Sequence, residues 1–173
     1  MCVLECTAEV LHFFDRLRAE HNNDSRLTDY LGVNYDTCHF AVEFENPVPA
    51  IACLLRHGIR VSKVQLSSAL RVCPGPEVCE HLAAFPEESY HHQVVALCHG
   101  GKRIIYRTLA QALAQAACSD MPELHECRIH LHVPLHCPDG EWFLNTNDHV
   151  VGVLDLLAAN PRLCPHLEIE TQT

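Results

Sequence analysis

The chain has 173 residues, 48% of them hydrophobic, and a formal net charge of −10. This length suits one domain over residues 1–173, with enough apolar residues for a sizeable core. The acidic charge argues against a nucleic-acid partner, because proteins that bind nucleic acid usually carry a basic stripe. No apolar run approaches the roughly 20 residues of a membrane span, and no basic segment leads into an apolar one at the N-terminus. We therefore expect a cytoplasmic protein without a membrane span.

Apolar periodicity, helix caps and turn residues divide the chain into helices that alternate with strands. In chain order the sequence predicts a helix over 7–21, a helical turn over 26–31, a strand over 32–36, a helix over 46–57, a strand over 59–66, a helix over 76–84, a β-hairpin over 91–107, a helix over 109–117, a strand over 127–134, a helix over 146–159 and a strand over 166–171. The hairpin is indicated by a His-Gly-Gly-Lys turn between two β-rich runs.

This alternation predicts parallel strands joined by crossover helices, with the hairpin as an insertion on one helix–strand unit. Four such strands fit either an open doubly wound sheet or part of a (β/α)8 barrel. No glycine-rich phosphate loop follows any strand, which disfavours a nucleotide-binding sheet.

Cysteine and histidine are both abundant, at eleven and fourteen residues. No Cys-x-x-Cys pair occurs, so a structural zinc site of paired knuckles is disfavoured. Most cysteines stand among apolar residues, where they serve as small core residues. Among the histidines, only those near the ends of predicted strands are candidates for chemistry.

Three predicted strands end in residues of the types that serve as metal ligands in proteins. Asp36 ends one strand, His132 lies near the end of a second, and Glu170 lies near the end of the last. Carboxylates and an imidazole at neighbouring strand ends are what a divalent cation requires. Side chains two apart on a strand share a face, so His130 and Glu168 are alternatives. We prefer the outer members, which lie nearer the open end.

Each of these residues also has a purely structural interpretation. Asp36 could cap a following helix, His132 could be a core histidine bonded to a backbone carbonyl, and Glu170 could be a solvated edge residue. Three ligand types at three strand ends nevertheless favour a shared site. Gln65 and Ser67, near the end of another strand, are either substrate contacts or ordinary polar positions.

Several segments resemble known families. The segment 36–39, Asp-Thr-Cys-His, resembles the Asp-Thr-x-His motif of xylose-isomerase-like TIM barrels, which include sugar isomerases, ketose 3-epimerases and endonuclease-type barrels. The segment 130–132, His-Leu-His, resembles their His-x-His strand. Over nearly the whole chain, the sequence is more similar to the metabolite traffic protein EboE family, through the segments 36–42, 63–70, 92–95, 130–135 and 166–171.

This resemblance implies the C-terminal part of a (β/α)8 TIM barrel, because a complete barrel needs roughly 250 residues and a further ligand glutamate would precede this chain. It implies that Asp36, His132 and Glu170 bind a divalent metal ion (Mn, Zn, Mg or Co) and that His39 contacts substrate. Glu5 is not expected to replace the absent glutamate, because it precedes a helix instead of ending a strand.

The expected function is an EboE-like metabolite traffic protein with isomerase or epimerase activity on a small sugar-like or polyol-like metabolite. Glu170 and His39 are the candidate catalytic residues, and His39, Gln65 and Ser67 are the candidate substrate-binding residues. One alternative is a metal-dependent phosphoester hydrolase, which Gln65 and the acidic charge disfavour. Another is a protein that binds or moves a metabolite without turning it over.

A half-barrel would expose an apolar interior and bare strand edges. We therefore expect the chain either to pair with a second copy or with a polypeptide that supplies the N-terminal half, or to be an incomplete product.

Overall fold

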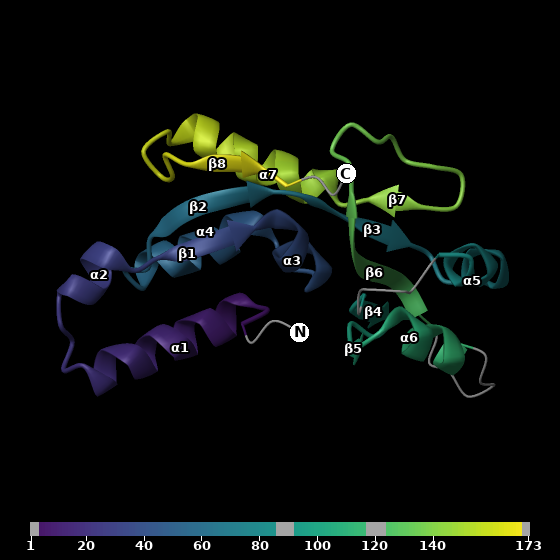
Figure 1. Cartoon of the computed structure of the whole chain (residues 1–173), viewed down its shortest axis with the longest axis horizontal. Coiled ribbons are helices and arrows are strands. Elements are labelled where there is room, and N and C mark those ends of the chain that lie inside the picture. Colours follow the sequence, from purple (N-terminus) through teal and green to yellow (C-terminus); the bar gives the residue numbers. More distant parts are fainter. Residues whose placement is uncertain (1–3, 86–91, 117–123, 171–173) are drawn as a thin grey trace.

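Two sheets organise the chain (Figure 1). A computed structural model describes residues 4–85, 92–116 and 124–170. The first sheet is parallel, in the order β1-β2-β8, and consists of β1 (Val33–Asp36), β2 (Val61–Leu66) and β8 (Leu167–Ile169). The second is antiparallel, in the order β5-β4-β6-β3-β7, and consists of β3 (Ser68–Val72), β4 (Val94–Cys98), β5 (Arg103–Tyr106), β6 (Leu124–Val133) and β7 (Leu144–Asn145).

Seven helices within the described residues surround these sheets. They are α1 (Thr7–Glu20), α2 (Arg26–Tyr30), α3 (Thr37–Val42), α4 (Pro47–Arg56), α5 (Pro76–Ala83), α6 (Leu109–Ala116) and α7 (Asn147–Ala159). None of these helices is long and apolar enough to cross a membrane.

The parallel sheet buries one face along β1 and β2 and leaves the other face polar, whereas all three residues of β8 are exposed. Tyr35, Val64 and Leu66 point to the buried face, where they form a core with residues of α1, α4 and α7. Because side chains alternate along a strand, the opposite face carries polar residues in register: Asn34 beside Lys63, and Asp36 beside Gln65 and Glu168. The apolar half-barrel interior that we expected is thus absent from this face, and pairing with a second copy or with another polypeptide stays a prediction.

A single extended stretch of chain joins the two sheets. β2 ends at Leu66 and β3 begins at Ser68, so Ser67 alone separates them. β3 then pairs antiparallel with β6 and places Ala69 opposite His132. This pairing brings the histidines of β6 to the C-terminal ends of the parallel strands.

The second sheet has its own core, which α5 and α6 cover. Leu82 of α5 and Leu109 of α6 pack against apolar side chains of the sheet, among them Leu70, Val72, Ala96, Tyr106, Cys127 and Ile129. This core is built from alternate residues of the strands. On the other face of the sheet, Ala69 and Val95 are buried against Cys38 and Val42 of α3.

The predicted C-terminal part of a TIM barrel, with parallel strands alternating with helices, is wrong. The predicted strand 127–134 is part of β6, which runs antiparallel to both β3 and β4. The physical cause is β3, which the prediction left out because it ended the preceding strand at Leu66. β6 pairs with β3 instead of with a parallel strand. It therefore does not run in the parallel direction that a crossover helix would give it.

The hairpin is not an insertion either. β4 and β5 form the expected antiparallel pair, but β4 lies inside the second sheet, between β5 and β6. Residues 91, 117 and 171, which the predicted hairpin, helix and last strand include, lie outside the described residues.

Candidate metal centre

The two sheets meet where the parallel strands end. Asp36 is the last residue of β1, Glu170 directly follows β8, and His132 comes from β6 of the second sheet. One ligand atom from each of these residues lies within 4.8 Å of the others. The structure thus brings together the three residues that the sequence proposes as metal ligands, although His132 arrives on an antiparallel strand.

The two oxygens of the Asp36 carboxylate have different surroundings: Oδ1 is hydrogen-bonded within the fold, and Oδ2 faces the candidate metal site. Oδ1 accepts hydrogen bonds from the backbone N–H groups of Cys38 (2.9 Å) and His39 (3.3 Å) and from Ser67 Oγ (2.7 Å). These bonds cap α3. Oδ2 lies 3.8 Å from His39 Nε2. Asp36 is therefore the helix cap that the structural interpretation proposed, and capping still leaves one oxygen for a cation.

Ser67 holds Asp36 in place. Ser67 is 1% exposed, and its hydroxyl both donates to Asp36 and accepts from the Cys38 N–H (3.2 Å). Thr37, which is fully buried, fixes the Ser67 backbone: its Oγ1 accepts from the Ser67 N–H (2.8 Å) and donates to the Ser67 carbonyl (2.6 Å). We therefore assign Ser67 to positioning and not to substrate contact. Thr37 is a positioning residue that the sequence reasoning missed.

Replacing Thr37 with valine is expected to lower the free energy of unfolding by about 1–3 kcal/mol, because the buried N–H of Ser67 loses its acceptor. Urea denaturation followed by circular dichroism measures this change. Thr28→Val, at an exposed position of α2, is the matched control. Equal shifts of the two midpoints would contradict the role given to Thr37.

His132 presents both ring nitrogens to ligand-type groups. Nδ1 lies 3.7 Å from Glu170 Oε2, and it is buried without a hydrogen-bond partner among the described residues. Nε2 lies 3.3 Å from Nε2 of His130. A buried polar atom without a partner is costly. A cation between His132, Glu170 and Asp36 would satisfy Nδ1, so the residues fit a metal.

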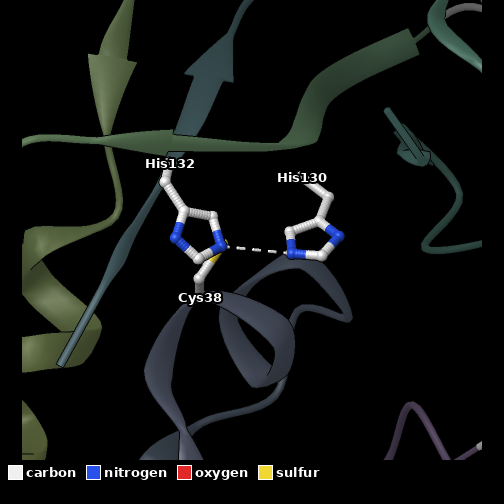
Figure 2. A group of neighbouring side chains, drawn as sticks. All are labelled: Cys38, His130 and His132. Carbon is white, nitrogen blue, oxygen red and sulfur yellow. Dashed lines mark hydrogen bonds between the residues drawn. The ribbon is translucent and has the colours of Figure 1, made fainter. Parts of the chain in front are cut away.

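A cluster of further polarisable groups adjoins this site (Figure 2). The rings of His39 and His130 meet edge to face, with centroids 4.0 Å apart. Burial, followed by the charge of neighbouring His39, lowers the pKa of His130 to about 3, so its ring is neutral at pH 7. Burial also raises the pKa of the Cys38 thiol well above its usual value, and the carboxylates of Asp36 and Glu170 add to this effect. Without a metal, Cys38 is therefore a thiol.

The remaining candidates lie on the polar face of the parallel sheet. Gln65 is half-buried, and its Oε1 accepts from Asn34 Nδ2 (2.7 Å). Glu168 is exposed and pairs with Lys63, which lowers the pKa of that carboxyl. Its carboxylate is thus already neutralised, which supports the preference for Glu170.

Glu5 takes no part in either group of metal-ligand type within the described residues. Its carboxylate accepts from Gln93 Nε2 (3.1 Å). Cys38 is the residue of chemical interest that the sequence reasoning passed over. Its position in the sequence between Asp36 and His39, two candidate site residues, could have indicated that it lies near the site.

Comparisons with known proteins identify no relative from which the chemistry of this site could be inferred. No protein-family model, no curated protein and no solved structure matches this chain. The resemblance to the EboE family and to xylose-isomerase-like proteins stays a prediction. The roles of Asp36, His132 and Glu170 are inferred from their positions and their chemistry.

Proposed function

We propose that this chain binds a divalent metal ion through Asp36, His132 and Glu170 and isomerises or epimerises a small hydroxy-carbonyl metabolite. The supporting observation is the meeting of two carboxylates and one imidazole, with ligand atoms within 4.8 Å of one another. Such a mixed oxygen and nitrogen set suits Mn, Zn, Co or Mg. The resemblance to sugar isomerases and to the EboE family points to the same class of small metabolite.

A metal ion bound there would polarise a carbonyl and its neighbouring hydroxyl, which makes the adjoining carbon–hydrogen bond more acidic. Glu170 is placed to take that proton and return it, because its side chain is 34% exposed and so can be reached by substrate. His39, with a side chain 24% exposed beside Asp36, is placed to hydrogen-bond a substrate hydroxyl. Gln65 adds an amide on the same face of the sheet.

Metal binding is tested by replacing Asp36 with asparagine. The amide oxygen can still cap α3, so the fold is retained, but a ligand charge is removed. The wild-type chain is expected to bind one Mn²⁺ ion, and the variant to bind it at least about 100-fold more weakly, since even the loss of an outer partner of a ligand costs 10–100-fold. Electron paramagnetic resonance of free Mn²⁺ gives the affinity. Asp155→Asn, an exposed acid on α7, is the control. Equal affinity of wild type and Asp36→Asn would reject the site.

Activity is tested by exchange of carbon-bound protons with deuterated water. Small ketoses such as dihydroxyacetone and fructose, incubated with the Mn²⁺-loaded protein, are expected to take up deuterium next to the carbonyl. Nuclear magnetic resonance detects the uptake. Metal binding without uptake by any ketose would count against an isomerase and favour the alternative of a protein that only binds its metabolite.

A further inference from the structure

We propose that Cys38, His130 and His132 form a second metal site, selective for Zn²⁺, that shares His132 with the first. One ligand atom from each of these three residues lies within 4.8 Å of the others. Figure 2 shows that both imidazoles project from β6 and that the Cys38 side chain projects from α3 toward them. A thiolate with two imidazoles is a softer ligand set than the two carboxylates of the first site, and it suits Zn²⁺ better than Mn²⁺ or Mg²⁺.

The position of Cys38 is held by the fold. Its side chain is fully buried, and its backbone N–H donates both to Asp36 Oδ1 (2.9 Å) and to Ser67 Oγ (3.2 Å). These bonds anchor the first turn of α3 and hold the thiol under the histidines. A ligand held in this way loses little conformational freedom when a metal binds.

The two histidines are likewise placed for a common ion. His130 and His132 are two apart on β6 and share a face. Their Nε2 atoms lie 3.3 Å apart, and only one of these two nitrogens can carry the proton between them. An ion that replaced this proton would be bound by both rings, while the thiol would supply the third ligand after losing its own proton to solvent.

The shared ring links this site to the first. Nε2 of His132 faces His130, while Nδ1 faces Glu170 at 3.7 Å. An ion at either nitrogen fixes the ring in the orientation that the other site needs. If both sites are filled together, the ring must lose its remaining N–H proton to solvent. Two adjacent dications also repel each other, so we expect the second ion to bind more weakly than the first.

The experiment uses Co²⁺ as a coloured substitute for Zn²⁺, added to the full chain. We expect a sulfur-to-cobalt charge-transfer band in the near ultraviolet that saturates at one equivalent of thiolate-bound ion and disappears when Zn²⁺ is added. Cys38→Ser is expected to abolish the band, and His130→Gln to weaken Co²⁺ binding at least about tenfold. Cys164→Ser replaces another buried cysteine, in the core of the parallel sheet, and is expected to keep the band.

Mn²⁺ binding separates this proposal from the first site. Cys38→Ser is expected to keep the Mn²⁺ affinity of the wild type, which also shows that the variant folds. Asp36→Asn is expected to lose Mn²⁺ binding but to keep the cobalt–sulfur band. Absence of the band in the wild type, or its persistence in Cys38→Ser, would overturn the second site whatever happens to Mn²⁺.

Discussion

Glu170→Gln is expected to lower the rate of metal-dependent deuterium exchange by about 10²–10⁴-fold, the usual contribution of a positioned acid or base. The glutamine cannot take a proton from carbon, although its oxygen can still reach the metal. The rate is measured at saturating Mn²⁺, so that weaker metal binding does not account for the loss. The expected fall is therefore in turnover and not only in metal affinity.

Glu168→Gln is the matched control for this prediction. Glu168 lies two residues earlier on the same face, but it is exposed and already paired with Lys63. We expect its replacement to leave the exchange rate within about a factor of two, because surface ion pairs contribute little. Similar losses in the two variants, or no loss in Glu170→Gln, would rule out Glu170 as the proton-transfer group.

Acid is expected to destabilise the fold through His149, by up to about 3 kcal/mol. His149 is 5% exposed, and its Nε2 lies 3.0 Å from the Tyr35 hydroxyl. Burial lowers the pKa of His149 from 6.5 to about 4, and burial raises the pKa of Tyr35. The hydroxyl therefore keeps its proton and donates to a neutral imidazole.

The sign of the effect follows from proton binding. As the pH falls below 6.5, the unfolded chain protonates His149, whereas the folded chain does not do so until about pH 4. The stability that neutral His149 contributes is complete above pH 6.5 and is lost between these two values. Urea unfolding at a series of pH values measures it.

His149→Gln is expected to flatten this dependence. His130 contributes in the same direction, because its pKa is lowered to about 3, so the comparison is between the slopes of variant and wild type. His136→Gln, at an exposed position, is expected to keep the wild-type slope. Parallel curves for wild type and His149→Gln would show that His149 does not carry the effect.

The sequence by itself was enough to locate most helices, the three parallel strands and the three proposed metal ligands. Helices α1, α4 and α7 have apolar stripes or caps that depend only on nearby residues. Asp36, His132 and Glu170 were found because they end strands, and a strand end is a local feature. Alternation of side chains made Glu168 and His130 alternatives, and the outer position of Glu170 and His132 along the strands decided between them.

Only the tertiary structure decided the direction of β6 and the surroundings of α3. The direction of a strand depends on the strand beside it, and β3 was hidden because Ser67 and Ser68 resemble the end of a strand. α3 is a short helix whose residues are nearly all buried, so it shows no amphipathic period. The nearness of Cys38 to His130 arises from this helix packing across two sheets, and no spacing along the chain encodes it.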